Sequence, residues 1–328
     1  MDINKIAELA GVSRATVSRY LNDGYVSQEK RERIARVIDE TGYVPSRRAK
    51  TLRTGRTEVV GVIIPKINSA SVSRMVAGIS GVLNDAGYQV LLANTDNDSS
   101  RELDFLRLFA ERDQVDGIIL IATVLSAAHV AAIRDAKAPV VILDQSLAGC
   151  SCVYQSDRDA VRAVTELVVA RGAAHPAYVG VFDEDVSAGH MRRLGFLDAC
   201  EAAGVSVPPA AMATAEFTVD SGYECAEQVL DAYPEVDALV CATDSIAYGA
   251  LTCLREYGRP VPDEVQVTGV GDAELSQIVM PTLTTVHHHY KTSGAEAARM
   301  LLGLMTGTNT VPREVKMGFE LVARNSTR

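Results

Sequence analysis

The first 22 residues constrain the fold of this chain more than any other stretch. Apolar residues recur at helical spacing from Ile3 to Ala10, Gly11 supplies a turn, and Ser13 is placed to cap a second helix. The inner face of that second helix is apolar, with Val17, Tyr20 and Leu21. The side chains on its outer face are short or cationic: Arg14, Ala15, Ser18 and Arg19. This pattern indicates a DNA-binding helix-turn-helix, although a small helical hairpin with a solvated charged face has the same spacing.

A third helix and a cationic segment follow. Ser27 is placed to cap the third helix, and Gly42 is placed to end it. Residues 46–53, SRRAKTLR, predict a further short helix in which Leu52 is surrounded by cations. An apolar side chain in that setting suits a wedge between base pairs in the minor groove. So short a helix does not persist alone, and we expect its folding to depend on DNA and on a partner hinge.

The charge of the chain is divided unevenly between its two parts. Residues 1–56 contain 12 Lys and Arg against 7 Asp and Glu, a balance of +5. Because the whole chain carries −10, the remainder carries −15. A cationic N-terminal part on an acidic body places nucleic-acid contact in the N-terminal part.

From Glu58 the pattern changes to alternating strands and helices. VVGVIIP is a continuous apolar run, as expected of a parallel strand buried on both faces. One series of strands and helices continues to VVILD, and a second begins at Tyr154. The final stretch, EVKMGFELVAR, predicts one or two closing strands. Two consecutive series predict two α/β lobes with right-handed crossovers.

Open α/β sheets bind ligands where their strands end, so we expect a crevice shared by the two lobes. The sequence there is polar and irregular: KINSASVSR, VFDEDVSAGHMRR, CATDS and GVGDAELS. It contains no GxxxxGK loop, no GxGxxG after the first strand and no Gly-x-Ser-x-Gly elbow. No specific nucleophile with a base or carboxylate pair is found either, so an enzyme and a bound cofactor are not expected.

Targeting and redox signals point to the cytoplasm. No apolar run approaches the ~20 residues that span a bilayer, and the N-terminus lacks a signal core. The six cysteines are expected to be reduced, and Cys150-x-Cys152 lacks the spacing of a zinc site. The three successive histidines of HHHYK alternate in direction on an extended chain, so no metal site is expected.

Three stretches, IAELAGVSRATVSRYLN, YVPSRRAKTLR and PTLTTV, resemble the lactose-repressor/galactose-repressor (LacI/GalR) family of bacterial transcription regulators. The resemblance runs through all 328 residues. The body is most similar to the disaccharide branch, the sucrose and trehalose repressors, through IPKINSASVSR, CATDSIAYGA and VGDAELSQIVMPTLTTV.

This resemblance implies an N-terminal all-α helix-turn-helix domain with a hinge helix, and a C-terminal two-lobed α/β effector domain like type I periplasmic binding proteins. We place the DNA-binding domain at 1–56 and the effector and dimerisation domain at 57–328. Lobe 1 is expected at about 57–155 plus 287–313, and lobe 2 at about 156–286 plus 314–328. The expected function is a homodimeric repressor of a carbohydrate-utilisation operon. It would bind pseudo-palindromic double-stranded operator DNA under the control of a sugar or sugar phosphate; the alternative is a soluble sugar-binding receptor without a DNA role.

The expected DNA contacts divide into base readers and anchors. Arg14, Ala15 and Arg19 match the family's base-reading positions, although Arg14 could instead contact phosphate. The remaining contacts are phosphate anchors at Ser13, Thr16 and Ser27, the hinge wedge Leu52, and the hinge cation Arg53.

The resemblance also assigns effector contacts in the crevice. Arg192 matches the family's ligand-clamping arginine, with Arg193 as its surface neighbour, and a guanidinium can span two hydroxyls. Phe217 matches an aromatic position that stacks on ligand rings, unless it is only core. The other first-lobe and crossover positions are Ser71, Val72, His288 and Tyr290.

Three further effector positions leave alternatives open. Asp159 is expected to accept a sugar hydroxyl or to cap a helix. Thr243 is expected to face the crevice, with Asp244 as a structural cap. Asp272 is included although GVGD departs from the family pattern, which places its aspartate where this chain has Gly271.

Overall fold

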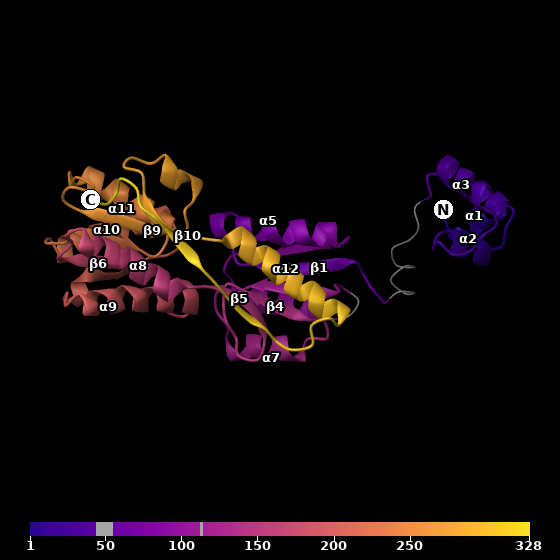
Figure 1. The fold of residues 1–328 in the computed structure, drawn as a ribbon, viewed down its shortest axis with the longest axis horizontal. Coiled ribbons are helices and arrows are strands. Elements are labelled where there is room, and N and C mark those ends of the chain that lie inside the picture. Colours follow the sequence, from indigo (N-terminus) through magenta and orange to yellow (C-terminus); the bar gives the residue numbers. More distant parts are fainter. Residues whose placement is uncertain (44–54, 112–113) are drawn as a thin grey trace. The chain divides into compact units, whose positions relative to one another are not determined.

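The computed structural model describes residues 1–43, 55–111 and 114–328, which form two compact units, Met1–Glu58 and Val59–Arg328 (Figure 1). We call the first unit the head and the second the body. The predicted hinge helix at 46–53, with Leu52 and Arg53, lies outside the described residues. No helix in the described ranges combines the length and the apolar character needed to cross a membrane.

Within its described residues, 1–43 and 55–58, the head has three helices, α1 (Ile3–Leu9), α2 (Arg14–Tyr20) and α3 (Gln28–Thr41). Its core comes from all three helices and their turns: Ile6, Ala7, Ala10, Val17, Val26 and Ile34. The predicted turn at Gly11 is confirmed by its positive φ of 62°. Arg33 of α3 holds this turn, because its Nη2 donates to the carbonyl oxygens of Ala10 and Gly11, each at 2.6 Å.

The predicted helix ends in the head are confirmed, with one difference. Ser13 caps α2, since its Oγ accepts a hydrogen bond from the Thr16 backbone N–H at 3.2 Å. Gly42 ends α3 in the left-handed conformation with φ of 60°. Ser27 occupies the position before α3, but its side chain makes no capping hydrogen bond.

Lobe 1 of the body is built on a six-stranded parallel sheet of order β11-β5-β4-β3-β1-β2. Its strands are β1 (Val59–Ile64), β2 (Gln89–Asn94), β3 (Gly117–Ile121), β4 (Val140–Leu143), β5 (Ser151–Gln155) and β11 (Glu314–Met317). Its helices are α5 (Ala70–Asp85), α6 (Ser99–Ala110), α7 (Ala127–Asp135) and α12 (Tyr290–Thr306). The apolar run at β1 is buried, as expected of a central parallel strand.

Lobe 2 repeats this plan in a second sheet of order β12-β10-β9-β8-β6-β7, in which only the edge strand β12 is antiparallel. Its strands are β6 (Pro176–Gly180), β7 (Met212–Thr214), β8 (Ala238–Cys241), β9 (Gln266–Val270), β10 (Thr284–His288) and β12 (Phe319–Val322). Its helices are α8 (Asp157–Ala170), α9 (Arg192–Ala202), α10 (Val219–Ala232) and α11 (Asp244–Glu256), with a π-helical turn at Val186–Met191 before α9. The two predicted α/β lobes are therefore confirmed.

Three connections join the lobes, between β5 and α8, between β10 and α12, and between β11 and β12 (Figure 1). They correct the expected lobe limits at two places. Residues 314–317 were placed in lobe 2 but form β11, which pairs with β5 of lobe 1. His287 and His288 were placed in lobe 1 but complete β10 of lobe 2. The alternating pattern of EVKM suits any edge strand, so only the pairing decides its sheet.

Helices α5 and α12 lie in close contact on lobe 1 through two glycines. A Cβ on Gly78 of α5 would lie 1.9 Å from the carbonyl oxygen of Lys291, and one on Gly294 of α12 would lie 2.1 Å from that of Met75. Any side chain at either position would therefore push the helices apart. Since Tyr290 begins α12, this packing also sets the position of the second connection.

Candidate functional site

The exposed face of α2 presents the three predicted base readers. Arg14, Ala15 and Arg19 are all exposed, and neither arginine forms an ion pair with another described residue. Val17 on the opposite face is fully buried and fixes the orientation of the helix. A short helix with free guanidinium groups beside a methyl group can contact phosphates and base edges.

The predicted phosphate anchors have different surroundings. Ser13 and Ser27 are exposed, whereas Thr16 is half-buried. The hydroxyls of Ser13 and Thr16 lie 2.9 Å apart, so each is already hydrogen-bonded within the head.

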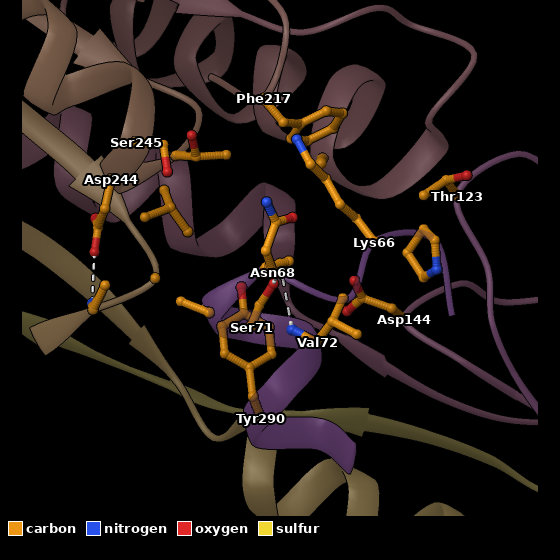
Figure 2. A pocket seen from close by; sticks show the side chains of 18 of the residues that line it. Lys66, Asn68, Ser71, Val72, Thr123, Asp144, Phe217, Asp244, Ser245 and Tyr290 are labelled. Atoms are coloured by element: carbon orange, nitrogen blue, oxygen red, sulfur yellow. Dashed lines mark hydrogen bonds between the residues drawn. The ribbon is translucent and has the colours of Figure 1, made fainter. Parts of the chain in front are cut away.

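A cavity of about 450 Å³ lies in the body, lined by residues of both lobes. Figure 2 shows Asp144 and Tyr290 of lobe 1 and Phe217 and Asp244 of lobe 2 around a common space. Most lining residues follow the carboxyl ends of parallel strands, where an open sheet binds ligands. The main polar and aromatic ones are Lys66, Asn68, Ser71, Arg74, Asn97, Thr123, Asp144, Asp185, Arg192, Phe217, Thr243, Asp244, Ser245, Tyr248 and Tyr290.

Arg192 forms one buried wall of this cavity and is held from behind. Its Nε donates to Asp157 Oδ1 at 2.7 Å, and its Nη1 donates to the Ala242 carbonyl oxygen at 2.6 Å. Burial alone would raise the pKa of Asp157, but the charge of Arg192 outweighs burial and holds that pKa below its usual range. Arg193 faces the surface instead and pairs with Asp183 at 2.7 Å, so of these two arginines only Arg192 lines the cavity.

Two buried carboxyl groups face the cavity near Arg192. Asp185 accepts hydrogen bonds from the Ala188 N–H and from Gln145 Nε2, both at 2.9 Å. Asp144 Oδ1 has no hydrogen-bond partner within the described ranges. Burial, followed by the charge of Asp157, raises the pKa of Asp144 to about 7, and burial raises the pKa of Asp185 to about 6. A ligand that donates hydroxyl hydrogen bonds would satisfy the free oxygen.

Aromatic and cationic groups complete the cavity. Phe217 packs edge-on against Phe182, with ring centroids 5.7 Å apart, and is only partly buried. The guanidinium carbon of Arg74 lies 5.1 Å from the centroid of the Tyr290 ring. Arg74 also donates to the carbonyl oxygens of Gly271 and Asp272, so it links lobe 1 to lobe 2 beside the cavity.

Comparisons with known proteins agree on the identity of both units. Residues 2–46 match the model of bacterial regulatory proteins of the lacI family, and residues 165–327 match a periplasmic binding protein-like domain. The chain is 32% identical to the sucrose operon repressor of Staphylococcus xylosus, over 90% of this chain and 91% of that protein.

The chain belongs to the lacI family of bacterial regulatory proteins.

Two solved structures extend this similarity to the whole regulator. One is the lac repressor dimer bound to operator and the anti-inducer ONPF, with a TM-score of 0.90 and 25% identity over 100% of this chain and 99% of that chain. The other is the complex of the transcriptional regulator CelR with cellobiose, with a TM-score of 0.78 and 29% identity over 99% of each chain. This LacI-family chain is thus a DNA-binding transcriptional regulator and not an enzyme.

The cavity of the regulator contains most of the predicted effector positions. Ser71, Val72, Arg192, Phe217, Thr243 and Tyr290 all line it. Thr243 faces the cavity as expected, but it, and not Asp244, caps α11. The Thr243 Oγ1 accepts from the Ile246 N–H at 3.3 Å. Asp244 is buried and accepts hydrogen bonds from Thr285, Ser276 and the Ala273 N–H.

Three predicted effector positions do not line the cavity. Asp159 is exposed on α8 and pairs with Lys316 of β11 at 2.6 Å, because the first turn of α8 directs Asp157 inward instead. Asp272 pairs with Arg324 at 2.5 Å and with His287 at 2.9 Å, away from the cavity. His288 is fully buried behind Tyr290, with ring centroids 5.5 Å apart.

Several polar cavity residues were not among the predicted effector positions, and four of them follow strands of the two sheets. Asn97, Thr123 and Asp144 come shortly after β2, β3 and β4, and Asp185 follows β6 in the predicted polar stretch. The signal for the first three is their place just after the carboxyl ends of parallel strands of lobe 1, where open sheets bind ligands.

Proposed function

We propose that this regulator is a homodimeric repressor of a carbohydrate-utilisation operon that acts in the cytoplasm. In this proposal the paired heads bind a pseudo-palindromic operator, and a small molecule in the body cavity controls that binding. The observation that carries the proposal is the combination of a cationic reading face on α2 with a polar cavity between two lobes of one chain. A soluble sugar receptor without a DNA role does not require the cationic reading face on α2.

A sugar or sugar phosphate fits the chemistry of the cavity. Hydroxyl groups both donate and accept, and the cavity offers carboxylates, amides, hydroxyls and a buried guanidinium around the aromatic rings of Phe217 and Tyr290. The similarity to a sucrose operon repressor and to a regulator solved with cellobiose supports a disaccharide such as sucrose or trehalose. The residues assigned to effector binding are Ser71, Val72, Arg192, Phe217, Thr243 and Tyr290.

The head and hinge would share the DNA contact. Arg14, Ala15 and Arg19 would read the major groove, with Ser13, Thr16 and Ser27 at the phosphates. Leu52 and Arg53 would act in the minor groove through the hinge. Separation of the two hinges by the effector would weaken the complex.

The test combines DNA binding with a sugar screen. Fluorescence anisotropy would measure the affinity of the purified dimer for duplexes from the region upstream of its own gene and for a scrambled duplex. Thermal shift would then compare sucrose, trehalose, cellobiose and the 6-phosphates of sucrose and trehalose. We expect preferential binding of one upstream duplex and a change in that affinity with one sugar. Equal affinity for both duplexes at every salt concentration would refute the repressor, and absence of any sugar effect would refute the class of effector.

A further inference from the structure

The imidazole of His288 is buried without a hydrogen bond. Its side chain has no exposed surface, and neither Nδ1 nor Nε2 has a partner in the part of the chain that the structure describes. The nearest acceptor, Asp157 Oδ1, is 3.6 Å from Nε2, which is too long for a hydrogen bond. A buried polar group without a hydrogen-bond partner destabilises the fold, so its retention calls for a second arrangement in which it is satisfied.

The position of this ring connects it to all three links between the lobes. Asp157 begins α8 directly after the first link, and Tyr290 begins α12 after the second. Phe319, at the third link, has its ring centroid 6.5 Å from that of His288. A displacement of the imidazole would therefore shift a neighbouring side chain at each of the three links.

The same ring lies directly behind the cavity. Tyr290 separates it from the cavity space, and Asp157 holds Arg192. One oxygen is shared: Asp157 Oδ1 accepts from Arg192 Nε at 2.7 Å and also faces His288 Nε2. A ligand that drew the guanidinium of Arg192 toward itself would weaken that bond and free the oxygen.

We propose that His288 is a positioning residue that couples occupancy of the cavity to the links between the lobes. When a ligand engages Arg192, His288 Nε2–H replaces Arg192 Nε as the donor to Asp157 Oδ1, and the link between β10 and α12 moves with it. The inference rests on the proposed function, because it takes a sugar at Arg192 as its trigger. Burial lowers the pKa of His288, and the charged groups around it are Asp157, Arg192 and His287. The ring is therefore neutral at pH 7, with one donor nitrogen to offer.

The test separates ligand affinity from response. The probe is whichever of sucrose, trehalose, cellobiose and the 6-phosphates of sucrose and trehalose raises the melting temperature of the wild-type dimer most. Calorimetry measures the affinity of the dimer for this probe. Fluorescence anisotropy measures its affinity for the operator with and without the probe. In His288→Phe we expect the sugar affinity to stay within about threefold of wild type, and the ratio of the two operator affinities to fall about tenfold or more.

Two variants serve as controls. His288→Gln retains a donor and should recover most of the response. His289→Phe alters a partly exposed neighbour that faces Glu320 at 3.6 Å, and should behave as wild type.

Each other outcome has a distinct meaning. An unchanged ratio in His288→Phe, or an equal loss of sugar affinity and response, would overturn the coupling role while leaving the proposed function in place. If neither these sugars nor the 6-phosphates of sucrose and trehalose bind the wild type, the sugar effector and this inference fall together. If His288→Phe does not fold, NMR of the histidine ring nitrogens in the wild-type dimer replaces it. Addition of sugar should move the ring-nitrogen chemical shift of one buried histidine from the free to the hydrogen-bonded value. An unchanged chemical shift would overturn the inference.

Discussion

Arg192 and Arg193 are neighbours in sequence with opposite surroundings. Arg192 is 4% exposed and shares a buried ion pair with Asp157, whereas Arg193 pairs with Asp183 at the surface. Exposed pairs contribute about 0–1 kcal/mol, but removal of one partner from a buried pair costs about 3–5 kcal/mol. The two arginines therefore form a matched pair for experiment.

For Arg192→Ala we expect loss of the response to sugar and a lower melting temperature, with operator binding retained at temperatures where the variant is folded. Arg193→Ala should resemble wild type in all three measurements. Thermal shift, calorimetry and operator anisotropy check these outcomes. Normal release of the operator by sugar in Arg192→Ala would exclude it as the clamp.

Asp144 gives a prediction in the pH dependence of stability. Its pKa is raised to about 7 by burial and by Asp157, so the folded state retains a proton that the unfolded state releases from about pH 4 upward. The contribution of this group to the unfolding free energy consequently falls as the pH rises from about 4 to 7. We expect Asp144→Asn to raise the melting temperature at pH 8 and to change it little at pH 5. A pH-independent difference between variant and wild type would contradict this.

Arg14 tests base reading against phosphate contact. If it reads a guanine, Arg14→Ala should cost about 1–3 kcal/mol on the best operator and relax the preference at one base pair. A phosphate contact would instead weaken binding equally on all sequences and reduce the salt dependence. Anisotropy on a set of duplexes with single base-pair changes distinguishes the two.

At the scale of the element, the α5–α12 contact determines how the second link enters lobe 1. Gly78 and Gly294 allow the two backbones to approach until each glycine meets a carbonyl oxygen of the other helix. Glycine weakens an isolated helix by about 1 kcal/mol relative to alanine. Its presence inside both helices is therefore explained by packing, not by helix propensity.

Helix α5 contains its own control for this packing argument. Gly81 is exposed, and a Cβ there would meet nothing within 4 Å. We expect Gly78→Ala to lower the unfolding free energy by about 1–3 kcal/mol through overpacking. Gly81→Ala should raise it by up to about 1 kcal/mol. Urea unfolding of both variants measures the difference, and equal effects would show that the helix contact is not close.

At the scale of the whole molecule, the two parts of the chain carry opposite net charges, which suit two different functions. The +5 of residues 1–56 favours DNA, whereas the −15 of the remainder keeps the body away from phosphate. In the proposed function, affinity for DNA resides in residues 1–56 and control of that affinity resides in the rest of the chain. The proposed hinge at 46–53 connects the two parts.

Leu52→Ala tests this division of tasks. Loss of the apolar wedge should weaken operator binding at least about tenfold, since a wedge trades unstacking energy for wider contact. Affinity for the sugar should be nearly unchanged. Anisotropy and calorimetry on the same preparation give both numbers, and a parallel loss of the two affinities would refute the separation.

The sequence by itself determined the head and the order of elements in the body. Helical spacing from Ile3 to Leu21, the cap at Ser13 and the stop at Gly42 are local signals, and local signals suffice for short helices. Continuous apolar runs such as that at β1 likewise predicted parallel strands. The short strands β5 and β7 were missed, because too few residues repeat in them to show a period.

Only the tertiary structure decided which polar residues meet. Asp157, rather than Asp159, turns inward to hold Arg192, because the first turn of α8 sets their directions. The same holds for His288, which lies one residue from a surface neighbour on either side and yet is fully buried where three segments meet. The contacts of Asp157 with Arg192 and of His288 with Phe319 join residues more than 30 positions apart, and they depend on how the helices and strands of lobe 2 pack together, which no local pattern records.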